Sequence, residues 1–385
     1  MKTHSKRIVI ISTIVVALSL LIFSLAFKRQ IAIRVAKHQI ENVFIDSTAA
    51  IEECNEFSLR ALSFRGVTIY REGFYDISIG SAGIDYKISA LLAGSVERAS
   101  IDRAVLKIDN KREGLASAKD WIRASQGSLF RLRDASVSDA RLDITTRDIN
   151  AEGAASFAVS LEEKKIKSVD LSDFTLTAND FSFKGMDVKG GSEEGMSISI
   201  SEIAYRDFIL KDASGTVGID GASVAISPFK AYIFDGTIGG DIILAFDRNG
   251  AFEVDLVCEA LNLARLIDDL KLAKKVRLTG ELSGNISLTG MALRVSGVSG
   301  KFSTEAPGGV LVIKDTRFLE NMAKGSDEST DLLMETFNNY QYNIGGVDIA
   351  LNGNDLLLNV ALSGDAGKRT FEVVVHDFIK EEVKR

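Results

Sequence analysis

Hydrophobic and polar residues follow three successive patterns along the chain. A run of uncharged residues extends over Ile8–Phe27, the next stretch, Ile31–Phe44, has apolar residues at helical spacing, and from about Phe57 apolar and polar residues alternate. Twenty helical residues span about 30 Å, the thickness of a bilayer's hydrocarbon core. An alternation of period two is typical of half-buried β-strands. The patterns therefore predict a membrane anchor, a helix and then a β-rich region.

These patterns give the chain a predicted domain organisation without a sharp internal boundary. It consists of a short basic tail over residues 1–7, a transmembrane anchor over residues 8–27, a juxtamembrane helix over residues 28–45 and a β-rich domain over residues 57–385.

A cleaved signal peptide is the alternative to an anchor. The apolar core of a signal peptide is usually about 7–15 residues long and precedes a small-residue cleavage site, whereas Lys28, Arg29 and Gln30 follow this run. A lipoprotein is disfavoured because the first cysteine is Cys54. The uncleaved anchor is the favoured interpretation. Basic residues flank the run on both sides in similar number, so the charge rule leaves the orientation open.

The alternation is clearest in the C-terminal half, where one apolar face recurs in five segments. We take the residues of this face as candidates for a lipid-binding surface: Phe252, Val254, Leu256, Leu282, Ile286, Leu288, Val347, Ile349, Leu351, Leu356, Leu358, Val360, Leu362, Phe371, Val373 and Val375. Hairpin signals at Asp220-Gly221, Asn249-Gly250 and Asn352-Gly353 predict an antiparallel meander.

Four short helices are expected to interrupt the strands. They lie at Ser117–Gln126, Asn262–Lys275, Asp315–Ala323 and Asp327–Asn339, and Asn262 is the expected N-cap of the second.

Composition and charge exclude several classes of protein. The net charge of −7 and the pI of about 5.3 argue against a nucleic-acid-binding protein. Two cysteines, Cys54 and Cys258, exclude a disulfide-dense scaffold and a cysteine-rich zinc module, and buried unpaired thiols are the favoured interpretation.

Candidate catalytic chemistry is sparse. The three histidines are far apart in sequence, which disfavours a histidine triad or a histidine-rich metal site. The glycine-rich stretch Gly364–Thr370 departs from a phosphate-binding loop, because Leu362 takes the first glycine position and Arg369 the Ser/Thr position. A hairpin turn explains it better. We expect no enzymatic activity, no metal and no cofactor.

Several segments resemble the AsmA-like superfamily of bacterial envelope proteins, which includes the TamB and YdbH branches. The similarity lies in a strand ending in a Leu-Leu-x-Gly turn, an aromatic turn with Asp-Gly before a short helix, a glycine-punctuated strand pair and a closing meander. The corresponding segments are Ile88–Asp109, Val217–Leu266, Val276–Gly300 and Gly309–Phe378.

The resemblance implies an elongated, curved antiparallel β-sheet with an apolar trough, a few short helices, and an inner-membrane anchor with the C-terminal domain in the periplasm. It also implies a role in phospholipid transport between envelope membranes or in outer-membrane biogenesis. The expected partners are a phospholipid or another acyl lipid, the inner membrane, and other envelope proteins at the C-terminal end. The competing hypothesis is a structural or assembly scaffold whose apolar face is an ordinary core, which fits the same alternation.

Overall fold

The protein is described here by a computed structural model in which strands dominate and helices are short. This confirms the predicted mostly-β class. The structure describes residues 28–44, 46–110, 131–147, 149–178, 181–193, 195–205, 208–220, 223–245, 250–269, 271–291, 294–304, 306–317, 319–320, 330–376 and 378–379.

The chain divides into two compact units, Met1–Asn179 and Asp180–Arg385, which we call unit 1 and unit 2. None of the helices in the described ranges combines the length and hydropathy needed to cross a membrane. The predicted anchor over residues 8–27 lies outside those ranges.

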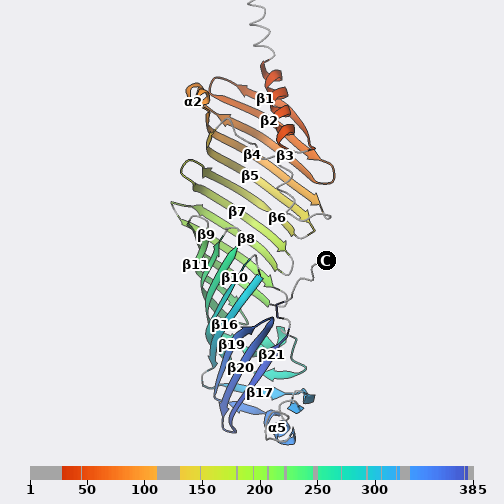
Figure 1. Ribbon diagram of the computed structural model, residues 1–385, viewed down its shortest axis with the longest axis vertical. Coiled ribbons are helices and arrows are strands. Elements are labelled where there is room, and N and C mark those ends of the chain that lie inside the picture. Colours follow the sequence, from red (N-terminus) through yellow and green to blue (C-terminus); the bar gives the residue numbers. More distant parts are fainter. Residues whose placement is uncertain are drawn as a thin grey trace, which may run out of the picture. The chain divides into compact units, whose positions relative to one another are not determined.

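The described part of unit 1 contains a helix over residues 28–43, followed by a series of neighbouring strands (Figure 1). Its elements are β1 (Thr48–Phe57), β2 (Ala61–Arg71), β3 (Tyr75–Asp85), α2 (Ile88–Leu92), β4 (Ser95–Asn110), β5 (Arg131–Thr146), β6 (Ile149–Ser160) and β7 (Lys165–Ala178). Each strand pairs with the next in chain order. The first strand starts at Thr48, earlier than the clear alternation in the sequence.

One pairing of unit 1 corrects the prediction of a wholly antiparallel sheet. Strands β4 and β5 run parallel, with Ser95 opposite Arg131 and Asn110 opposite Thr146. Parallel neighbours need a connection of a dozen or more residues, and residues 111–130 supply it. The predicted helix Ser117–Gln126 falls in this connection, outside the described residues.

Unit 2 continues with strands that also pair mostly with their neighbours in sequence. Its main sheet contains β8 (Phe181–Gly191), β9 (Gly195–Tyr205), β10 (Phe208–Asp220), β11 (Ser223–Ile233), β12 (Gly236–Ala245), β13 (Ala251–Asn262), β15 (Glu281–Met291), β16 (Arg294–Thr304), β19 (Ile344–Asn352), β20 (Asp355–Gly364) and β21 (Gly367–Val375). All of the pairings described within this sheet are antiparallel.

A second, small sheet in unit 2 has three short strands. They are β14 (Val276–Leu278), β17 (Gly309–Ile313) and β18 (Tyr340–Tyr342), and α3 (Leu263–Asp269) and α5 (Thr330–Phe337) accompany them. The helices α3 and α5 fall within the predicted ranges but are shorter. The stretch Gly364–Thr370 is a hairpin, because Gly364 pairs with Gly367 between β20 and β21.

β-Bulges lie on several strands of both units. In unit 1, Arg103 of β4, Asp139 of β5 and Asp173 of β7 adopt positive φ where the pairing register shifts or is interrupted. In unit 2, Gly185 and Asp212 have positive φ on the two strands that flank β9. A bulge bends its strand and increases the local twist. The bulges at Arg103 and Asp139 lie at matching positions of the paired strands β4 and β5, so their bends add.

The predicted N-cap of α3 is confirmed in detail. The Asn262 side-chain Oδ1 accepts hydrogen bonds from the backbone N–H of Ala264 at 3.0 Å and of Arg265 at 3.3 Å. These donors belong to the first turn of the helix, where the backbone has no helical acceptor.

We expect Asn262→Ala to lower the free energy of unfolding by about 1 kcal/mol, because both amides lose their acceptor. Asn262→Asp is the matched control, since its carboxylate can accept the same bonds and is expected to stay close to the wild type. Chemical denaturation of the three proteins measures the difference. Equal losses for Ala and Asp would contradict the capping role.

Candidate functional site: an apolar sheet face with a charged rim

One face of the unit 1 sheet is apolar from strand to strand. Pairing places Ile77, Leu106, Leu142, Gly153 and Phe174 in one row across β3–β7. A second row, nearer the other strand ends, contains Ala82, Ile101, Val137, Phe157 and Val169. Leu106 and Ile101 are five residues apart, as are Leu142 and Val137, so regular alternation would place the two rows on opposite faces. The bulges at Arg103, Asp139 and Asp173 shift the alternation by one residue, so the rows share one surface.

The opposite face of the same strands is polar. Arg141 and Asp143 of β5 are exposed, whereas Leu142 and Ile144 between and beside them are half-buried. On the apolar face Phe157 keeps 41% of its surface exposed. The apolar side chains of β6 and β7 thus form a surface that the described residues leave partly open.

The helix over residues 28–43 covers the first end of this face. Its Ala32 is buried in a cluster with Cys54, Phe64, Val67 and Tyr75 of β1–β3. The Phe44 ring, directly after the helix, packs against Tyr75 with ring centroids 6.1 Å apart. Figure 1 shows this helix lying across β1–β3. The helix therefore covers the face around Phe64 and Tyr75, whereas Ile84 at the strand ends keeps 38% of its surface exposed. Among the described residues the face becomes more open toward β7.

The sixteen candidate residues of unit 2 fall on one face of its main sheet. Their register is continuous: Leu256 pairs with Ile286, Ile349 with Leu358, and Leu358 with Val373. Gly300 of β16 stands between Ile286 and Ile349 in the same row. The alternation seen in the sequence thus corresponds to one surface.

The candidates divide by what covers them. Leu282 is buried, and Leu256, Ile286, Val347 and Ile349 pack against the same cluster, which also contains Phe229 and Phe302. Leu362, Val360 and Phe371 belong to a second cluster with the small sheet and α5. The remaining candidates belong to neither described cluster and are half-buried or, for Val375, exposed: Phe252, Val254, Leu288, Leu351, Leu356, Leu358, Val373 and Val375.

The small sheet and α5 close one end of the unit 2 face. Phe337 of α5 is fully buried and meets the Phe371 ring edge-on at 6.3 Å. Tyr340 donates a hydrogen bond through its hydroxyl to the Gly367 carbonyl at 2.6 Å. The small sheet and α5 therefore form a cap over the β20–β21 part of the face.

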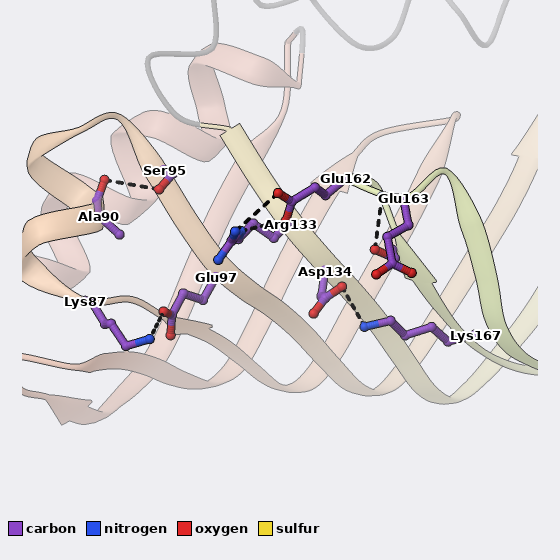
Figure 2. A network of polar contacts seen from close by, with 10 residues as sticks. Lys87, Ala90, Ser95, Glu97, Arg133, Asp134, Glu162, Glu163 and Lys167 are labelled. Atoms are coloured by element: carbon purple, nitrogen blue, oxygen red, sulfur yellow. Dashed lines mark hydrogen bonds and ion pairs between the residues drawn. The ribbon is translucent and has the colours of Figure 1, made fainter.

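Charged side chains line one rim of the unit 1 sheet, where an open pocket of about 890 Å³ lies at the strand ends. Figure 2 shows three ion pairs in this network: Lys87 with Glu97 at 2.6 Å, Arg133 with Glu162 at 2.7 Å, and Lys167 with Asp134 at 2.8 Å.

The alternation of β4 and β5 determines which face each rim residue joins. Glu97 and Arg133 share the face of Ala99 and Ala135, whereas Asp134 lies on the opposite face. The hydrogen bond from Lys167 is the main cause that lowers the pKa of Asp134, so the Asp134 carboxyl remains ionised at neutral pH and is protonated only in acid. Both signs of charge thus border the apolar face.

The two cysteines are free and buried, as the sequence predicted. Burial raises the pKa of Cys258 to about 11 and also raises that of Cys54. At neutral pH both are thiols rather than nucleophilic thiolates. In the described ranges, no three potential metal ligands come together.

Comparison with known families assigns the chain. Residues 161–369, more than half of its length, match the model of the family described as YdbH-like, intermembrane phospholipid transport protein YdbH. The chain belongs to the YdbH-like family. The predicted resemblance to the AsmA-like superfamily is thereby confirmed. No curated protein and no solved structure gave a significant match.

The YdbH-like match covers β7–β20 and every candidate residue except Phe371, Val373 and Val375. Sequence reasoning missed the apolar face of β2–β7 and of β8–β12. The signal was present in short stretches such as Arg141–Ile144, which alternates polar and apolar residues. It was masked because each bulge inserts one residue and shifts the alternation by one.

Proposed function

We propose that this member of the YdbH-like family carries phospholipids between envelope membranes, with their acyl chains on the apolar face of the sheet. In this proposal residues 8–27 anchor the chain in the inner membrane, the following domain lies in the periplasm, and no chemical reaction is catalysed. The family description, intermembrane phospholipid transport, supports the cargo. Contact with other envelope proteins at the C-terminal end stays a prediction.

The continuity of the apolar face is the observation that carries this proposal. In unit 1 the rows run unbroken across β3–β7, and the described helix covers the beginning of the face. Each acyl methylene removed from water contributes about 0.8 kcal/mol, so a partly open apolar surface binds lipid tails without polar recognition. The charged rim keeps the headgroups beside ionic side chains and water.

The scaffold hypothesis retains one specific observation in its favour. Val360, Leu362 and Phe371 pack under the small sheet and α5, as residues of an ordinary core do. This part of the face serves stability. The half-buried rows of unit 1 distinguish the two hypotheses, because a scaffold has no use for an apolar surface, and the described residues leave this one partly open.

The phospholipid content of the purified full-length chain tests the proposal. We expect Leu142→Glu, which places a charge in the middle of the unit 1 face, to lower the co-purified phospholipid several-fold by mass spectrometry. Arg141→Glu is the control, since its side chain lies on the polar face of the same strand. Phospholipid that co-purifies with the anchor alone is the same in both variants, so it does not contribute to the difference. Equal phospholipid in both variants would argue for the scaffold.

A further inference from the structure

The turn between β1 and β2 presents an apolar tip to solvent. Leu59 is 73% exposed, Phe57 before it is 40% exposed, and Ile88, at the start of α2, is 46% exposed. Turns of soluble proteins usually carry Gly, Asn, Asp, Ser or Pro at such positions. The turn at the other end of β2 follows that rule, since it contains Glu72 and Gly73.

Hydrogen bonds hold this tip in place. The Ser58 N–H donates to the Ala61 carbonyl at 2.9 Å, and the Ser58 hydroxyl oxygen accepts from the Ala61 N–H at 3.0 Å. Tyr86 fastens the tip to the segment before α2, since its hydroxyl donates to the Ser58 carbonyl at 2.6 Å and its N–H to the Arg60 carbonyl at 2.8 Å. The Leu59 side chain is therefore displayed by a well-bonded turn.

The tip lies beside the end of the predicted anchor. The Lys28 ammonium donates to the Phe57 carbonyl at 3.4 Å and lies 6.0 Å from the centre of the Phe57 ring. Lys28 directly follows the uncharged run that ends at Phe27. A side chain in contact with the first residue after a membrane-crossing helix lies at the level of the lipid headgroups.

The chemistry around the tip matches a lipid interface. Lys28 contacts Phe57, Arg60 follows Leu59 in the turn, and Lys87, paired with Glu97, precedes Ile88. This mixture of apolar and basic residues suits anionic headgroups over an acyl boundary. The row of the apolar face nearest the tip contains Leu62, directly opposite Ile84. The tip and the apolar face are thus adjacent on the same strands.

We propose that the turn Ser58–Ala61, together with Phe57 and Ile88, inserts into the headgroup region of the membrane that holds the anchor. The insertion brings the edge of the apolar face at Leu62 and Ile84 into contact with the bilayer, so lipid tails reach the apolar face there. This inference rests on the proposed function, because it assumes an anchored chain that handles phospholipid.

The test uses a fluorophore on the full-length chain in vesicles of phosphatidylethanolamine and phosphatidylglycerol. Leu59→Cys carries an environment-sensitive label, and Glu72→Cys, in the polar turn at the other end of β2, is the matched control. Cys54 and Cys258 are buried, so the label goes to the introduced thiol. With spin-labelled lipids we expect at least two-fold stronger quenching at position 59 than at position 72.

Equal quenching at the two positions would overturn the inference. The inference would also be overturned if lipids did not quench the label at position 59 and cross-linking showed that a second copy of the chain or a protein partner covers this position. If phospholipid co-purifies with the wild type but position 59 is not quenched, the tip proposal fails and lipid transport stands. If position 59 is quenched but Leu142→Glu leaves the phospholipid content unchanged, the membrane contact stands and the transport proposal fails.

Leu59→Asp adds a functional readout. The turn keeps its Ser58 and Tyr86 hydrogen bonds in this variant, so the thermal melt is expected to match the wild type. We expect the transfer of fluorescent phospholipid from donor vesicles to slow several-fold, whereas Glu72→Asp leaves the rate unchanged. An unchanged rate for Leu59→Asp would contradict a role of the tip in lipid entry.

Discussion

Leu358→Glu is expected to leave unit 2 folded and to abolish the lipid-dependent function. Leu358 lies in the row formed with Ile349 and Val373, is half-buried and belongs to neither described cluster. A carboxylate there stays partly hydrated, so we expect a stability loss below about 1 kcal/mol and a melting shift below about 4 °C. The same charge meets acyl chains in the loaded state, where its desolvation is costly.

Leu362→Glu is the matched variant on the same strand and the same face. Leu362 is 5% exposed and packs with the small sheet and α5, so its replacement buries an unpaired charge. We expect this variant to lose more than about 4 kcal/mol of stability. Thermal melts and growth under detergent stress measure both effects. A Leu358→Glu melt as low as that of Leu362→Glu would show an ordinary core at both positions and favour the scaffold.

Phe337→Ala should destabilise the cap by about 3–5 kcal/mol, the usual cost of removing a buried phenylalanine ring. Phe337 is fully buried between Phe371 of the main sheet and Tyr340 of β18, at ring-centre distances of 6.3 and 5.8 Å. The resulting cavity separates α5 from the main sheet. Hydrogen exchange of β18 amides, together with the thermal melt, reports the loss.

The control for this variant is Glu335→Ala. Glu335 is exposed on the same helix, and its removal should change stability by less than about 0.5 kcal/mol. If Phe337→Ala leaves β18 as protected as the wild type, α5 does not hold the cap in place.

The C-terminal meander could be predicted because its strands are regular. In β13, β15 and β19–β21 apolar and polar residues alternate over most of each strand. The strand β13 pairs with β15, and β20 pairs with both β19 and β21, so each of these strands lies beside the strand nearest to it in the meander. The cap of α3 was equally predictable, since Asn262 directly precedes an apolar helical pattern. Local sequence determines both features.

Other features depend on contacts that local sequence does not encode. The parallel pairing of β4 with β5 follows from where a long connection returns the chain, which no residue of either strand specifies. The strands β14 and β18 have three residues each, too few to show any period. At Asp139 the bulge places Val137 and Ala140 on one face, although their separation of three residues predicts opposite faces.

The aligned bulges have a consequence for how a bound molecule moves. Because the paired strands β4 and β5 bend at matching positions, Arg103 and Asp139, the two present nearly the same profile, at a spacing of about 4.8 Å. A hydrocarbon tail that steps from one strand to the next exchanges one set of methyl contacts for an equivalent set. Across β4 and β5 the surface is thus nearly periodic, and in the proposed transport a tail would pass between them without a source of energy of its own.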